Sequence, residues 1–98
     1  MLSKISEARN YICETIKNMK GEEIMPEIVE EIIEEKLYDK VEPLLTDSDL
    51  QMLSQNEENE DFAENYMIQK VPNYINLLEQ TVKEILAEYI TEENLDNN

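Results

Sequence analysis

Only four residues in this 98-residue chain, one glycine and three prolines, are of the types that most often interrupt regular structure. They stand at Gly21, Pro26, Pro43 and Pro72. An all-β domain of this length needs many tight turns, and such turns draw heavily on glycine and proline. The sequence is therefore predicted to form a small number of long elements with short connections, which is typical of packed helices.

Apolar residues recur at three- and four-residue steps through most of the chain, which is the period of an amphipathic helix. This pattern predicts a first helix over residues 3–20, with Gly21 as its stop. A second helix is expected to begin at Pro26 and to end or kink at Pro43. The predicted core-facing residues of these two helices are Ile5, Ala8, Ile12, Ile16, Met19, Ile28, Val29, Ile32, Ile33, Leu37 and Val41.

A further helix start is encoded near the middle of the chain. Thr46 and Asp49 have the spacing of a capping box, in which the hydroxyl and the carboxylate each accept a backbone N–H. This predicts a short helix with Leu50 and Leu53 in the core. The polar, acidic residues 54–61 are then expected to form a loop, with negative charge at the positive end of the next helix.

Two more helices are expected after this loop, separated by a hinge at Pro72, because proline holds Val71 away from helical geometry. The last helix is expected to start near Asn73. Their predicted buried residues are Phe62, Ala63, Tyr66 and Met67, and then Ile75, Leu78, Val82, Ile85, Leu86 and Tyr89. The sequence thus predicts an all-α fold, a small single-domain bundle of four or five helices over residues 1–90, with a frayed acidic tail at 91–98.

Charge limits the classes of partner. The chain has 24 acidic and 8 basic residues, and its formal net charge is −16. Such a charge disfavours nucleic-acid backbones and anionic lipid, and favours basic protein surfaces. Charged residues interrupt the apolar residues of the N-terminus, so neither a signal peptide nor a membrane span is predicted. We therefore expect a protein partner, and no direct binding to nucleic acid or membranes.

No catalytic constellation is predicted. The chain has no histidine, so the usual nucleophile and acid–base pairs are missing, and a single glycine excludes a glycine-rich phosphate loop. With Cys13 alone there is no internal disulfide, which indicates a reducing cytoplasm. Cys13 is interpreted as a small, partly buried apolar residue, and the alternative is a redox-sensitive thiol. A cytoplasmic, non-enzymatic protein with no cofactor is expected.

The spacing of four acidic and polar residues suggests a calcium-binding loop as an alternative interpretation. Asp47, Asp49, Gln51 and Glu58 stand at the first, third, fifth and twelfth positions of a calcium-binding EF-hand loop. Met52 occupies the sixth position, where a glycine normally permits the sharp turn. The same residues are better explained as a helix start, so no metal ligands are predicted.

The candidate functional surface lies on the predicted second helix, where the glutamates project opposite the isoleucine and valine face. The predicted partner-binding residues are Glu27, Glu30, Glu31, Glu34, Glu35 and Tyr38. Five carboxylates over about 12 Å of helix give a charge density comparable to that of a DNA strand, which places about three or four phosphates in that length. Tyr38 lies near the middle of the acidic side, and tyrosine is enriched among residues that dominate binding.

Two functions are predicted for this surface. The leading hypothesis is a non-catalytic protein-binding module, an adaptor, inhibitor or assembly subunit, that acts through the acidic helical surface. The alternative is a nucleic-acid mimic of the phage or mobile-element type that inhibits a nuclease or a defence protein. A third interpretation is that the charge only keeps the protein soluble. The apolar row from Met25 to Leu45 suits a crossed helix, either within the chain or on a second copy, so a homodimer stays open.

Residues 44–90 resemble an uncharacterised bacterial family of short acidic helical proteins, a domain of unknown function. The similar segments are LLTDSDLQML, the acidic linker after it, and DFAENYMIQKVPNY. Phe62, the hinge at 71–73 and the helix at 75–86 carry the similarity, over about half of the chain. The resemblance implies a helical fold and transfers no site residues.

Overall fold

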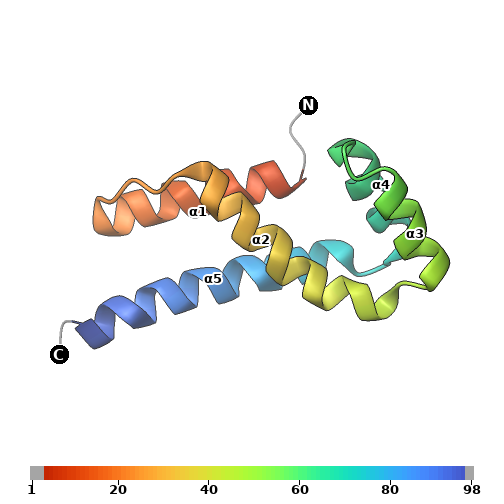
Figure 1. The fold of residues 1–98 in the computed structure, drawn as a ribbon. Coiled ribbons are helices and arrows are strands. Elements are labelled where there is room, and N and C mark those ends of the chain that lie inside the picture. The colour runs from red at the N-terminus through yellow and green to blue at the C-terminus, as the bar shows by residue number, and fades with distance from the viewer. Residues whose placement is uncertain (1–3, 97–98) are drawn as a thin grey trace.

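The computed structural model describes residues 4–96, with side chains for 4–59 and 61–89. This part of the chain consists of five α-helices and one short 3-10 turn, without strands (Figure 1). The helices are α1 (Lys4–Lys20), α2 (Pro26–Val41), α3 (Asp47–Gln55), α4 (Glu60–Lys70) and α5 (Tyr74–Asp96), and the 3-10 turn is η1 (Glu42–Leu44). The predicted all-α fold is therefore confirmed.

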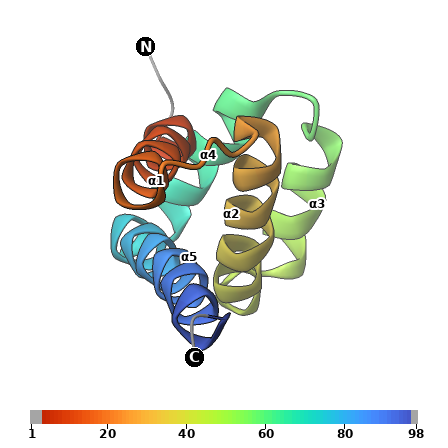
Figure 2. The ribbon, with the colours of Figure 1, turned by 90° about the vertical axis from the view of Figure 1, so that its left-hand side faces the viewer.

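Three of the helices, α1, α2 and α5, pack most closely and form the body of the molecule. Figure 2 shows them around a common axis, with α3 beside α2 on the side away from α1. The helices α3 and α4 make an arm at one end of this body, next to the first turn of α1 (Figure 1). The arm contacts the body more sparsely than the three body helices contact one another.

The ends of the helices follow the predicted interruptions. Gly21 has a φ of +71°, and its N–H donates to the carbonyl of Lys17 at 2.8 Å, which closes α1 in a conformation that glycine adopts without steric cost. Pro26 opens α2, and Pro43 falls in the 3-10 turn after it. Val71 is extended, with φ −115° and ψ 100°, as expected before a proline. These breaks are confirmed.

The core is formed mainly by one row of side chains from each body helix. Its buried members are Ala8, Ile12, Ile16, Val29, Ile33, Leu37, Val41, Val71, Tyr74, Leu78 and Ile85. The buried row of α2 repeats every four residues, which suits crossed helices, and it packs within this chain against α1 and α5. A homodimer is not needed to cover these buried residues and stays a prediction.

Four residues predicted to face the core are exposed instead. The exposed fractions are 60% for Met19, 48% for Ile28, 37% for Ile32 and 41% for Ile75. Ile28 and Ile32 each precede a buried residue of α2, so they lie about 100° around the helix from the row that α1 and α5 cover. Met19 is in the last turn of α1, which extends past the start of α2 (Figure 1).

The second half of the chain departs from prediction at two ends. The helix α3 continues to Gln55 and α4 begins at Glu60, so the predicted loop over 54–61 is shorter than expected. The helix α5 extends past the expected end near Ile90 and reaches Asp96. Residues 97–98 of the predicted frayed tail lie outside the described residues. In the absence of a glycine or proline after Ile90, no local signal ends the helix there.

The predicted buried face of α4 was wrong in detail. Phe62, Ala63, Tyr66 and Met67 are only half-buried, whereas the one buried residue among the described side chains of this helix is Glu64, at 7% exposure. A carboxylate is buried there because it is hydrogen-bonded to the start of α1, as described below. Leu53 of α3 is buried and Leu50 is half-buried, so that helix lies as predicted.

Candidate functional site

The acidic side of α2 is divided by the packing of the other helices. Glu27, Glu31 and Glu35 are exposed and form a row with four-residue spacing, which we call the outer acidic row. Glu30 is half-buried, and its carboxylate lies 3.7 Å from the guanidinium of Arg9 on α1. The structure therefore keeps three of the predicted glutamates on one outer surface and engages Glu30 in the contact between α1 and α2.

Both lysines of α2 lie away from the outer acidic row. The Nζ of Lys36 is 3.1 Å from Glu88 Oε1, and that of Lys40 is 2.9 Å from Glu84 Oε1, both on α5. The hydrogen bond and charge of Lys40 lower the pKa of Glu84 below its ordinary value. Among the described residues no basic side chain pairs with Glu27, Glu31 or Glu35, so the charge of the outer acidic row faces solvent unneutralised.

The two remaining predicted residues, Glu34 and Tyr38, line a groove of about 480 Å³ between the body and the α3–α4 arm. We call it the α2/α4 groove. Its apolar lining residues are Ile5, Leu37, Leu50, Leu53, Ala63 and Met67. Its polar lining residues are Glu34, Tyr38, Ser54, Glu57 and Glu64. The groove thus joins one predicted glutamate and the predicted tyrosine to residues of three other helices.

Glu64 holds α4 against the start of α1. The backbone N–H of Lys4 donates to Glu64 Oε1 at 2.8 Å, and that of Ile5 donates to Oε2 at 3.1 Å. The first N–H groups of a helix have no partner within it and carry partial positive charge, so a carboxylate there is stabilising. Glu64 acts as a cap for α1 supplied from another helix.

A buried tyrosine lies within the electrostatic influence of the groove carboxylates. Tyr74 is 1% exposed, and its hydroxyl has no hydrogen-bond partner among the described residues. Burial raises the pKa of Tyr74, and the charges of Glu64 and Glu34 raise it further. The hydroxyl therefore stays protonated, and it serves the core as the end of a large, mostly apolar side chain.

The α3–α4 arm is fixed by a second carboxylate. Asp49 accepts a hydrogen bond from the Thr46 N–H at 3.0 Å, while its own N–H donates to Thr46 Oγ1 at 3.1 Å, so the predicted capping box is confirmed. The hydroxyl of Tyr66 on α4 donates to Asp49 Oδ1 at 2.6 Å. Because Asp49 caps the start of α3 and also binds α4, it positions the wall of the α2/α4 groove.

Acidification is expected to weaken this arm. The hydrogen bond from Tyr66, followed by that from Thr46, lowers the pKa of Asp49 below its usual 3.8. A pKa that is lower in the folded state means a contribution to stability that is present above the unfolded pKa and lost as pH falls through the folded one. The melting temperature of the wild type should therefore exceed that of Asp49→Asn at about pH 6, and the difference should shrink below about pH 4. A difference that is independent of pH would contradict this assignment.

The residues of the calcium alternative lie in this arm. Asp47 to Gln55 form the helix α3, so they do not form an EF-hand loop, and the interpretation as a helix start is confirmed. No group of three side chains able to hold a metal ion occurs in the described part of the chain.

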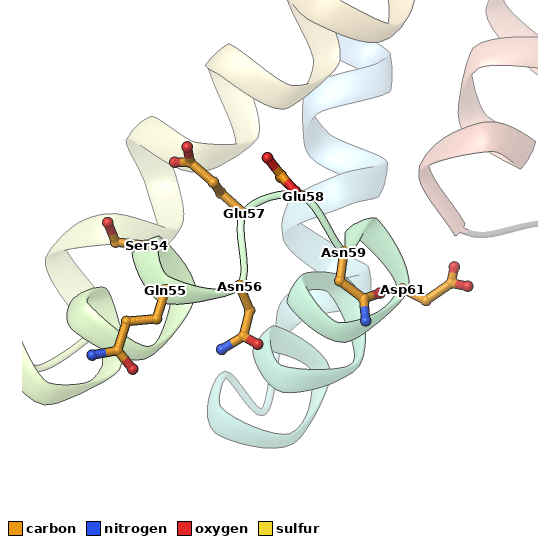
Figure 3. Close-up of a pocket in the computed structure, with 7 residues that line it drawn as sticks. All are labelled: Ser54, Gln55, Asn56, Glu57, Glu58, Asn59 and Asp61. Carbon is orange, nitrogen blue, oxygen red and sulfur yellow. The ribbon is translucent and has the colours of Figure 1, made fainter.

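A second, polar hollow of about 790 Å³ follows the loop between α3 and α4. Its lining residues are Ser54, Gln55, Asn56, Glu57, Glu58, Asn59 and Asp61. Figure 3 shows their side chains pointing in different directions from the loop, without converging on one point. This arrangement lacks the convergent polar groups that fix a small ligand.

Cys13 is half-buried, as predicted, with its Sγ 4.0 Å from the carbonyl oxygen of Ile24. Burial raises the pKa of the thiol, and the charge of Arg9 opposes this only in part. A raised pKa lowers the thiolate fraction, so Cys13 has the environment of a packing residue.

Sequence reasoning missed the contribution of the α3–α4 arm to the site. Glu64 carried one signal, because it is an acid between the apolar residues Ala63 and Met67 on a predicted amphipathic helix.

Comparisons with protein families, curated proteins and solved structures find no match for the chain. The resemblance of residues 44–90 to a bacterial family stays a prediction. Within the described residues no helix is long and apolar enough to cross a membrane.

Proposed function

We propose that this chain is a non-catalytic, cytoplasmic protein-binding module that binds a basic protein surface through the outer acidic row. Glu27, Glu31 and Glu35 are exposed and stand at intervals of four residues, which is about 6 Å along the helix axis. A row of like charges costs helix stability, and here no described basic side chain offsets that cost. A basic partner surface would offset it on binding.

The observation that carries the proposal is the position of the two α2 lysines. Lys36 and Lys40 both bind α5, on the side of α2 opposite Glu31. Had either lysine lain between the glutamates, the surface would carry mixed charge. The protein instead presents a surface of one sign, which speeds encounter with an oppositely charged partner and makes binding sensitive to salt.

A nucleic-acid mimic is the second candidate, because the spacing of the outer acidic row favours it. Three carboxylates lie over about 12 Å of helix, where one DNA strand places about three or four phosphates. Glu30 adds little to this density because Arg9 lies 3.7 Å from it. The mimic differs from the general module in its partner, which would be a nuclease or another nucleic-acid-binding protein.

The test is a pulldown from a lysate of the source cell with three immobilised proteins, washed at low and high salt. They are the wild type, the variant Glu27→Gln/Glu31→Gln/Glu35→Gln, and the control Glu7→Gln/Glu14→Gln/Glu79→Gln, whose three acids are exposed on α1 and α5. The wild type and control should retain the same basic protein at low salt, and the outer-row variant should lose it. Equal retention by both variants would refute a role for the outer acidic row.

The identity of the retained protein separates the two candidates. A nucleic-acid-binding protein that is displaced both by salt and by added double-stranded DNA would support the mimic. A basic protein that added DNA does not displace would support the general module.

A further inference from the structure

We propose that the α2/α4 groove anchors the partner by taking aliphatic side chains of a basic amphipathic helix. The proposal rests on the proposed function, since it assumes that the partner is a protein. It adds where the apolar part of the contact lies and which kind of segment fits there.

Six of the eleven residues that line the groove are apolar. Of these, Leu37 and Leu53 are buried, and Ile5, Ala63 and Met67 are half-buried. A volume of about 480 Å³ lies within the range of sites that bind ligands, about 300–1,000 Å³. Amphipathic helices bind such grooves by inserting apolar residues at three- and four-residue steps.

The charge of the groove selects a basic segment. Three glutamates, Glu34, Glu57 and Glu64, belong to its lining, and among the described residues no lysine or arginine does. Glu64 accepts hydrogen bonds from two backbone N–H groups of α1, so it contributes negative electrostatic potential to the groove more than a direct contact with the bound segment. Glu57 is exposed, which allows it to meet a lysine or arginine that flanks the inserted aliphatic residues.

The groove is continuous with the outer acidic row. Tyr38, 40% exposed, lines the groove and lies seven residues, or about two turns, after Glu31 on the same side of α2. A helix of the partner that is anchored in the groove can therefore extend past the tyrosine along the outer acidic row. Tyrosine is well suited to this position because it offers both an aromatic face and a hydroxyl.

The two walls of the groove belong to separately packed parts of the molecule. One wall is α2, within the closely packed body, and the other is the α3–α4 arm, which contacts the body more sparsely. The spacing between the walls can adjust without disturbing the buried rows of the body, because segments with few contacts open at lower free energy. The flexible side chain of Met67 adds to this adaptability.

The test uses a synthetic amphipathic helix with leucines on one face and lysines on the other as the probe. Two control peptides replace the lysines by glutamates or the leucines by serines. The protein variant is Ser54→Trp, which places a large ring at an exposed position of the groove lining. The matched control is Gln51→Trp, which is exposed on the same helix outside the lining.

The leucine and lysine peptide should bind the wild type and Gln51→Trp with similar Kd, and Ser54→Trp should raise the Kd at least about tenfold. Methyl NMR signals of Ile5, Leu53 and Met67 should shift on titration of the wild type. Urea denaturation of both tryptophan variants checks that they are folded. Equal Kd for the two variants, or no shift of the groove methyl signals, would overturn the groove as the anchor.

The outer-row variant separates failure of this inference from failure of the proposed function. If Ser54→Trp binds normally and Glu27→Gln/Glu31→Gln/Glu35→Gln does not, the groove is refuted and the outer acidic row stands. If the leucine-to-serine peptide binds as tightly as the probe, the contact is only electrostatic, which also refutes the groove. If the pulldown retains no basic protein, the proposed function fails, whichever peptide binds.

Discussion

Replacing Ile33 with alanine is expected to lower the free energy of unfolding by about 2–5 kcal/mol. Ile33 has no exposed surface, and it lies in the row of α2 that packs between α1 and α5. Its truncation removes apolar surface from the core and leaves a cavity that close-packed helices fill only in part. Urea denaturation followed by far-UV circular dichroism measures the change. For a domain of this size, the loss is a large fraction of the total stability.

The neighbouring isoleucine provides the control. Ile32 is 37% exposed, so Ile32→Ala should cost less than about 1 kcal/mol. The two variants remove the same atoms from consecutive residues of one helix, so their difference reports the burial. If Ile32→Ala were as destabilising as Ile33→Ala, the orientation of α2 described above would be wrong.

Replacing Glu64 with alanine is expected to cost about 1–3 kcal/mol, the largest effect among the polar residues considered. The variant leaves the N–H groups of Lys4 and Ile5 without their carboxylate and removes the negative charge at the start of α1. Urea denaturation measures the stability. Amide hydrogen exchange in the first turn of α1 should also become faster, which a general loss of packing elsewhere would not predict.

Glutamine is the graded control at this position. Glu64→Gln keeps one oxygen acceptor and removes the charge, so its free energy of unfolding should fall between those of the wild type and Glu64→Ala. Asn65→Ala, at the exposed next residue of α4, should be close to neutral. If Glu64→Ala left exchange in the first turn of α1 unchanged, Glu64 would not be the cap of that helix.

The cap at Glu64 also bears on the proposed binding site. The same carboxylate lines the α2/α4 groove and joins α4 to α1, so it fixes one wall of the groove relative to the body. Asp49 fixes the other helix of the arm through Tyr66. A partner segment that enters the groove would therefore meet an arm whose two helices are joined to each other by Asp49 and to α1 by Glu64, and whose other packing against the body is sparse.

Helix ends were predictable because their causes are local. Each cause acts within about four residues. These causes are the positive φ at Gly21, the ring of Pro43, the restriction that Pro72 places on Val71, and the capping box at Thr46. No tertiary contact is needed to decide them. The strong acidic character of one side of α2 was equally local, because charge and helical period are properties of the sequence.

Burial was less predictable, because a period gives an apolar stripe without saying how wide the covered part is. On α2 the stripe included Ile28 and Ile32, but α1 and α5 cover only the row through Ile33. On α4 the apolar residues were correctly placed on a helix, yet the buried residue is Glu64. Its burial depends on two N–H groups of α1, which are about 60 residues away in the chain.

The sequence by itself determined an all-α chain, the main breaks between its helices, and a helix with one strongly acidic side. Tertiary structure alone decided how that acidic side is used. It engages Glu30 with Arg9, directs Glu34 and Tyr38 to the α2/α4 groove, and leaves an outer row of three exposed glutamates. The physical reason is that the period of its own helix decides on which side a residue lies, whereas the residues that it contacts belong to helices that are distant in sequence and close in space.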